Sequence, residues 1–173
     1  LPPGSASPQP TDSIFRSEPS DGGNAADGDG QVSGVSFNAQ TDEFTVDGLA
    51  FDGDNVYQRG RAVSSLNGFA VYEASAQFDD PLNNLPINQF THRAVYGVSA
   101  SGNTQFAIIR TGAFTDFGFG GFLYQRNGGV VLPTEGQANY VGQAAAVRDF
   151  NGRGGLEYAT ADVNIAIDFT DFD

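Results

Sequence analysis

The sequence predicts an all-β protein made of antiparallel strands, and three observations lead to that prediction. Short apolar runs alternate with polar residues along most of the chain, and its 23 glycines lie mostly between those runs. Fifteen residues are Phe, whose large flat side chains pack well against cross-strand neighbours. No stretch longer than two turns shows a helical period. We therefore expect antiparallel sheets in a sandwich or barrel.

The first 30 residues are poor in apolar side chains and rich in Pro, Ser, Gly and Asp. Such a stretch buries too little surface to offset the entropy lost on ordering. We expect a disordered leader or tether over 1–30. Ile14 and Phe15 are the exception and are expected to dock onto the body.

Strand signals begin at residue 31. The dipeptide Asn67-Gly68 is a strong hairpin signal, and residues 79–88, which are polar and contain Pro, are expected to form a loop. Turn residues such as Asp47-Gly48 separate the runs. The strands expected in this half are 31–38, 44–46, 49–51, 56–64 and 69–78.

The second half of the chain continues the pattern. Residues 104–111 are apolar on both faces at their centre, which is typical of a central strand covered on both sides. Residues 159–169 alternate strictly and predict a half-buried strand. The strands expected in this half are 92–100, 104–111, 117–124, 137–148 and 159–169. The apolar face of the last strand comprises Ala159, Ala161, Val163, Ile165, Ile167 and Phe169.

The charge balance excludes several classes of partner. The net charge is −13, all eight basic residues are Arg, and the chain has no Cys. Nucleic acid and anionic membrane surfaces would repel such a chain. Disulfides and thiolate metal sites are impossible without Cys. No apolar run approaches the roughly 20 residues that a membrane-spanning helix needs. The chain starts at Leu1 without an initiator Met, so we expect a mature or trimmed form.

No residue pattern indicates a catalytic site. His92 is the only histidine, so a Ser–His–Asp triad would need it, and no Gly-x-Ser-x-Gly elbow is present. A structural role on a sheet face is the favoured interpretation of His92. Asp149 and Glu157 are the carboxylate pair that a glycosidase would use, which is the weakest hypothesis. We assign no catalytic residue.

Calcium is the one cofactor that the sequence leaves open. Asp is abundant beside Gly, at 27–30, 47–48 and 52–55, and the favoured oxygen ligands in these clusters are Asp52, Asp54 and Asn55. Their spacing fits neither an EF-hand nor a nonapeptide repeat, and Asp-Gly is first of all turn chemistry. Otherwise no cofactor is expected.

Aromatic residues between glycines form a candidate binding surface. The residues are Phe117, Phe119, Phe122 and Tyr124. The favoured alternative is structural, because Gly beside aromatic rings lets strands bend and pack closely. Arg148 and Arg153 flank the last loop, where ion pairs that pin the loop are favoured over capture of an anion.

One stretch resembles a known family. Residues 132–136 (Leu-Pro-Thr-Glu-Gly) lead into a small-residue strand that ends Tyr140-Val141-Gly142. This resembles the start of the β-barrel in transferrin-binding-protein-B-like surface lipoproteins of Gram-negative bacteria. The strand 159–169, ending Ile-Asp-Phe, is similar to the next barrel strand. Tyr96-Gly97-Val98, Gly120-Gly121-Phe122 and Tyr124 lie where that family has a handle-like sheet, so the resemblance covers 90–173.

The resemblance implies a domain plan. Residues 31–131 would form a handle-like β region, and 132–173 the first strands of an up-and-down barrel of about eight strands. Either the polypeptide is truncated or another chain supplies the missing strands. A lipid-bearing Cys upstream of Leu1 would anchor the protein, with 1–30 as the tether. The family's ligand contacts lie in loops that have no match here.

These observations predict a non-enzymatic binding or accessory protein. It would be exported to the outer membrane surface, the periplasm or the extracellular space. Loops such as 79–88 and 149–155 would contact a partner, which is another protein or a second copy of the chain. Membrane contact is expected only through the lipid anchor. The alternatives are a structural subunit joined by strand addition and, more weakly, a carbohydrate-active enzyme.

Overall fold

The computed structural model describes residues 14–19, 32, 34–49, 52–111, 120–149 and 155–171. Every regular element in these ranges is a β-strand and every strand pair is antiparallel, which confirms the predicted fold class. The described strands are β1 (Ile14–Pro19), β2 (Gly34–Asn38), β3 (Glu43–Asp47), β4 (Val56–Arg59), β5 (Ser65–Leu66), β6 (Phe69–Ala74), β7 (Gln77–Asp79), β8 (Pro86–Asn88), β9 (His92–Val98), β10 (Thr104–Thr111), β11 (Gly120–Arg126), β12 (Gln137–Asp149) and β13 (Leu156–Asp168).

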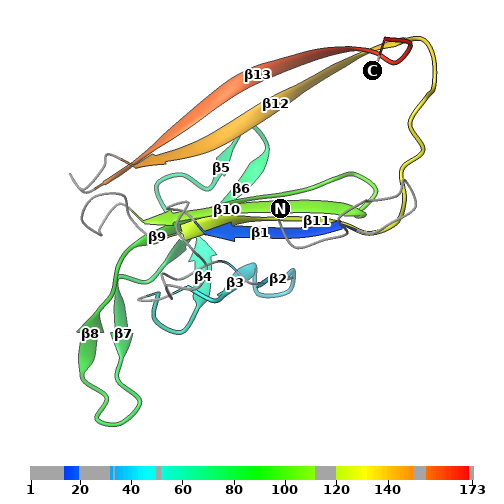
Figure 1. Ribbon diagram of the computed structural model, residues 1–173. Helices are drawn as coiled ribbons and strands as arrows, with labels where there is room; N and C mark the ends of the chain where they lie inside the picture. Colours follow the sequence, from blue (N-terminus) through cyan, green and yellow to red (C-terminus); the bar gives the residue numbers. More distant parts are fainter. Residues whose placement is uncertain are drawn as a thin grey trace.

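Most strands belong to one sheet, the main sheet, with the order β1-β11-β10-β9-β6-β4-β3-β2 and with β5 paired to β6. This sheet curls into a nearly closed, barrel-like layer (Figure 1). The curl brings β3 against β9, although β4 and β6 separate them in the sheet order. The ring centroids of Phe44 and Tyr96 are 5.0 Å apart, and Phe37 of β2 lies 6.0 Å from Tyr96. Aromatic rings therefore fill the concave side.

The core follows from the alternation of the strands. Every second side chain points into the curl, and a slip of one residue would move the whole set to the outer face. Phe44 and Tyr72 stack at the centre with 5.2 Å between ring centroids. The buried hydrophobic residues of this core are Val32, Phe44, Val46, Tyr57, Tyr72, Ala74, Ala94, Ala107, Ile109 and Leu123.

β1 is an edge strand, although it comes from the segment expected to be a tether. It pairs with β11 from Ile14 opposite Arg126 to Pro19 opposite Gly121. The expected docking of Ile14 and Phe15 is therefore observed, and it extends to six residues. Pro19 fits here because an edge strand has one side without ladder partners. The rest of the expected tether lies outside the described residues.

β10 has the central position that its apolar pattern predicts. It pairs with β9 on one side and with β11 on the other. Ala107 and Ile109 are buried inside the curl, and Ile108 is half-buried on the outer face. On that outer face Gly97 of β9 leaves room for the rings of Phe69 and Phe106, whose centroids are 5.2 Å apart.

The single strand expected over 69–78 is wrong at its second half. The strand stops at Ala74, where the Ser75 hydroxyl donates to the Gln77 carbonyl at 2.6 Å and accepts from the Gln77 amide at 3.2 Å. These local bonds redirect the backbone, as Ser side chains often do. The expected loop over 79–88 is instead part of the hairpin β7–β8.

β12 and β13 form a separate hairpin of thirteen residue pairs that lies across the outer face of the main sheet (Figure 1). β12 contacts β9 and β10, and β13 contacts β5. The guanidinium of Arg93 lies 5.5 Å from the ring centroid of Tyr158 in β13. The nearly closed, barrel-like sheet thus comprises described strands up to Arg126, and residues 137–168 contribute the hairpin.

The predicted half-burial of residues 159–169 is only partly correct. The strand and its alternation are present, but Ile165 is 51% exposed, and so is its cross-strand neighbour Tyr140 at 52%. Phe169 is buried. The difference arises because the opposite face, which carries Tyr158, turns toward the main sheet near the hairpin end. The alternation identified two faces but not which one packs.

Candidate functional site

The hairpin of residues 77–88, here called the finger, projects from the main sheet (Figure 1). Phe78 at its base packs against the turn at Gly53, where an added Cβ would lie 3.3 Å from the Cβ of Phe78. Gly53 has a φ of +77°, so both its backbone and its surroundings favour glycine. The Gln89 amide donates to the Ala76 carbonyl at 2.9 Å. The base is therefore fixed to the scaffold.

The tip of the finger is ordered by Asp80. Its carboxylate accepts a hydrogen bond from the Leu82 amide at 2.8 Å and another from the Asn83 side chain at 3.2 Å. Its carbonyl accepts from the Asn84 amide at 2.7 Å, and its own amide donates to the Leu85 carbonyl at 2.9 Å. Asn83 in turn accepts from the Leu85 amide at 2.8 Å. This is an Asx-type turn that holds the tip in one conformation.

The ordered tip carries exposed aliphatic side chains. Leu82 is 93% exposed, Leu85 63% and Ile87 41%. Single exposed apolar residues are ordinary, but here three of them, two at the tip and one in β8, occur on one twelve-residue projection. A fixed backbone with apolar tips is a common arrangement for contacts between proteins, because little entropy remains to be lost on binding.

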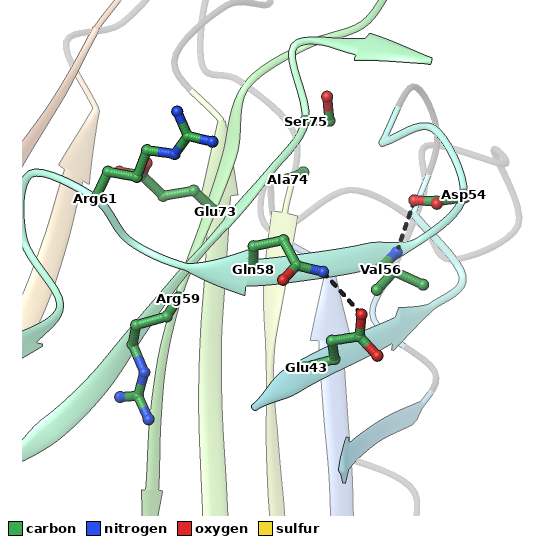
Figure 2. Close-up of a pocket in the computed structure, with 9 residues that line it drawn as sticks. All are labelled: Glu43, Asp54, Val56, Gln58, Arg59, Arg61, Glu73, Ala74 and Ser75. Atoms are coloured by element: carbon green, nitrogen blue, oxygen red, sulfur yellow. Dashed lines mark hydrogen bonds between the residues drawn. The ribbon is translucent and has the colours of Figure 1, made fainter. Parts of the chain in front are cut away.

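A cleft of about 580 Å³ lies at the root of the finger (Figure 2). In Figure 2, Arg61 and Glu73 lie at one end, and Asp54 and Glu43 at the other, with Gln58 between them. The lining residues are Glu43, Asp54, Val56, Gln58, Arg59, Arg61, Glu73, Ala74 and Ser75. The last two lead directly into β7, so cleft and finger are continuous.

Most charges around this cleft are already paired. Arg59 donates to both oxygens of Asp42, at 2.8 and 3.0 Å, and its guanidinium lies 4.6 Å from the ring centroid of Tyr72. The bond from Arg59 holds the pKa of Asp42 below its usual value. Arg93 bonds Glu73 at 3.1 Å. These pairs leave little charge free to bind a small ion.

Glu43 and Arg61 differ from these pairs. Hydrogen bonds from Thr41 at 2.7 Å and Gln58 at 3.0 Å lower the pKa of Glu43, so it stays ionised. Arg61 is exposed and makes no hydrogen bond or ion pair with any residue that the structure describes. It is therefore a guanidinium that a partner's carboxylate could engage.

A buried polar cluster lies inside the curl. Tyr57 donates to the Asp52 carboxylate at 3.1 Å, and burial raises the pKa of both groups. His92 is fully buried, its Nδ1 lies 3.1 Å from the Phe90 carbonyl, and burial lowers its pKa to about 4. Its Nε2 has no hydrogen-bond partner among the described residues. A neutral, enclosed imidazole of this kind cannot reach a substrate in solvent.

The residues proposed for calcium do not converge. Asp52 points inward to Tyr57, whereas Asp54 accepts from the Val56 amide at 3.1 Å beside the cleft. Asn55 adopts a left-handed turn with a φ of 60°. In the ranges that the structure describes, no group of three or more His, Cys, Asp or Glu residues could hold a metal ion. Asp54 and Asn55 therefore serve the turn, whereas Asp52 pairs with Tyr57.

The proposed aromatic surface is described only in part. Phe117 and Phe119 lie outside the described residues. Phe122 and Tyr124 share the outer face of β11 and are half-buried, opposite Ile108 and Phe106 of β10. They form a continuous apolar layer of the main sheet.

The last loop shows an ion pair of the kind favoured from the sequence. Arg148 and Glu157 face each other across the hairpin, with 3.5 Å between Nη1 and Oε2. Both side chains are more than half exposed, so the pair contributes at most about 1 kcal/mol. Arg153 lies outside the described residues, as does most of the loop 149–155.

The finger was not predicted as a hairpin, because the composition of residues 79–88 is that of a polar loop. The pattern Asp80-x-Leu82-Asn83-Asn84, with an Asx residue starting a turn, could have indicated it.

Comparisons with family models, curated proteins and solved structures found no significant match to this chain. Within the described residues no helix has the length and apolar character needed to cross a bilayer.

Proposed function

We propose that this chain is a non-enzymatic binding or accessory protein that acts by contact, with the finger and the adjoining cleft as its contact surface. The display of Leu82 and Leu85 on a turn held by Asp80 is the observation that carries the proposal. Covering exposed apolar side chains with a partner removes them from water, which lowers the free energy of the complex. The fixed turn keeps the entropy cost of that contact small.

The chemistry of the surface favours another protein as the partner. Apolar anchors at the tip with polar and charged groups behind them match the core and rim of protein interfaces. Arg61 and the ionised Glu43 offer the rim one group of each sign. A net charge of −13 disfavours nucleic acid and anionic lipid.

The enclosure of the chain's one histidine supports a non-enzymatic role. A general base must reach the proton that it removes, and the imidazole of His92 is enclosed in the core. At the cleft, the Glu43 carboxylate already accepts hydrogen bonds from Thr41 and Gln58, and the Glu73 carboxylate is paired with Arg93. The proposal also includes an exported location, at the outer membrane surface, in the periplasm or outside the cell. Its support is the resemblance at 132–142 and the acidic, Lys-free composition.

Site-specific photo-crosslinking in the cells that make the protein tests this function. A benzophenone amino acid replaces Leu82 in one variant and Val131 in the other. Val131 is 86% exposed but lies outside the finger, so it is a matched control. We expect a discrete protein adduct from position 82 and none from position 131. The proposal fails if position 82 gives no adduct, or if both positions give the same ones. Cell fractionation of the same samples tests the exported location.

A further inference from the structure

The hairpin β12–β13 has a long edge with no strand partner in the part of the chain that the structure describes. β13 pairs with β12 over thirteen residues, and these two strands form a sheet of their own. Two strands alone are marginally stable in water, and a third or fourth strand stabilises them. β12 contacts β9 and β10, and β13 contacts the short strand β5. In Figure 1, β13 lies on the side of β12 that faces away from the main sheet, so β13 offers the accessible edge.

The hydrogen-bond parity of the ladder identifies the groups on that edge. The Phe169 amide donates to the Gly136 carbonyl at 2.8 Å, which continues the register of the hairpin by one pair. In an antiparallel ladder such directly bonded pairs alternate with non-bonded ones. Odd-numbered residues of β13 therefore bond to β12. Even-numbered residues, from Thr160 to Asp168, direct their N–H and C=O groups to the open edge.

This edge carries few of the features that usually prevent strand addition. Residues 156–168 contain no Pro, Gly or basic residue, and the register has no bulge. Its apolar face exposes Ile165 at 51%, next to Tyr140 of β12 at 52%. An accessible edge joined to a partly uncovered apolar face fits a partner strand with the same alternation.

We propose that the partner strand is β13 of a second copy, paired antiparallel about a two-fold axis at Val163. Residues whose numbers sum to 326 then face each other, so Ala161 faces Ile165 and Ala159 faces Ile167. This register is the one that sets the Asp162 carboxylate opposite the Asn164 amide. Pairing centred on Asp162 would oppose two carboxylates, and centring on Ile165 would oppose Asp162 to Asp168. Such like-charge pairs are unfavourable.

The pairing gives a closed dimer. A two-fold contact uses the same edge of both copies, so it ends at two. The hairpins join as one four-stranded sheet, β12-β13-β13-β12, with the apolar faces of both copies on the same side. The contact is separate from the finger, so it leaves the proposed contact surface free. The charge of −13 on each copy opposes the approach, and salt therefore favours the dimer.

Cysteine cross-linking tests the register directly, because the chain has no Cys of its own. Val163→Cys places two thiols at a non-bonded antiparallel pair, where Cα atoms lie about 4.5 Å apart and a disulfide can form. Val141→Cys is the control: it is more exposed, at 78%, but lies on β12. We expect disulfide-linked dimers under mild oxidant from V163C at least about ten times faster than from V141C.

Sedimentation of two matched variants tests the energetics. Asn164→Asp puts carboxylates opposite Asp162 twice in the dimer and is expected to weaken dimerisation about tenfold. Asn139→Asp makes the same change on the same face of β12 and is expected to leave it unchanged. A chain that stays monomeric at every concentration overturns the proposal. So do open polymers, equal cross-linking of V163C and V141C, or equal effects of N164D and N139D.

Discussion

The side-chain amide of Asn67 donates a hydrogen bond to the carbonyl of Ala144 at 3.2 Å, which joins the β5–β6 turn to the β12–β13 hairpin. A second bond, 3.4 Å long, reaches Ala161, the residue directly opposite Ala144. Asn67 and Gly68 have φ angles of 46° and 85°, which form the two-residue turn that the dipeptide predicts. Asn67 therefore forms the turn and also holds β12, whose Ala144 lies 77 residues further along the chain.

Asn67→Asp should loosen the hairpin without opening the turn. Asp tolerates the left-handed conformation, but it replaces the donor with a carboxylate beside two carbonyl oxygens. We expect faster hydrogen exchange along β12 and β13, by a factor that corresponds to about 1–3 kcal/mol. Asn84→Asp is the control, with a similar φ of 55° and an exposed site in the finger. Unchanged exchange in the hairpin of N67D would show that other contacts hold it.

Gly97→Ala should destabilise the main sheet. The added Cβ would lie 2.6 Å from Cε1 of Phe106 and 2.9 Å from Cδ1 of Phe69, so both rings must move. Overpacking of this kind costs about 1–3 kcal/mol, which denaturant unfolding can measure. Gly142→Ala meets nothing within 4 Å and should leave stability unchanged or slightly raised. In the G97A background, Phe106→Leu should recover part of the lost free energy of unfolding, because the smaller side chain makes room for the new methyl group. If the effects of the two substitutions simply add, the packing argument is wrong.

His92 should make stability depend on pH in a defined window. Its pKa is about 4 when folded and about 6.5 when unfolded, so the unfolded chain binds the proton more tightly between these values. Stability therefore falls as the pH drops from about 6.5 to about 4, by roughly 3 kcal/mol in total. His92→Phe should remove this component, measured as the difference between the two unfolding curves across pH. A constant difference over that window would contradict the prediction.

The Asp52 carboxyl should oppose that trend at lower pH. Burial raises its pKa in the folded state, so the folded chain holds this proton more tightly than the unfolded chain. Protonation of Asp52 therefore stabilises the fold as the pH falls, and the contribution is lost as the pH rises through the raised pKa. Asp52→Asn should flatten this component in the same unfolding series. If D52N and the parent protein show the same change in stability at low pH, the hydrogen bond from Tyr57 keeps the Asp52 carboxylate ionised.

Asp80→Ala should free the tip of the finger and leave the scaffold intact. It removes the acceptor of the Leu82 amide and of the Asn83 side chain. We expect faster exchange at the Leu82 amide, weaker photo-crosslinking from position 82, and a global stability change within about 0.5 kcal/mol. Asp79→Ala, the exposed neighbour in β7, is the control for loss of one negative charge. Equal exchange rates in the two variants would mean that Asp80 does not order the tip.

Residue patterns alone predicted most of the strands in the main sheet and the two faces of each. Apolar residues on both faces, Ala107 and Ile109 on one and Ile108 on the other, predicted a central position for β10, and Asn67-Gly68 predicted a hairpin turn. Such signals are local, because side-chain period and turn conformation depend on neighbouring residues in the chain. The interpretation of His92 as a residue on a sheet face was likewise available from the pattern around it.

Which face of a strand packs, and which side chains come together, depends on contacts between distant segments. Period two gives a strand two faces but does not say which one meets the main sheet, so the exposure of Ile165 could not be predicted. The stop after Ala74 depends on the bonds between Ser75 and Gln77, and the finger depends on Asp80. Asp52 and Asp54 likewise bond to different groups, the Tyr57 hydroxyl and the Val56 amide. These outcomes are set by contacts between segments and by competing hydrogen bonds, which residue order alone does not specify.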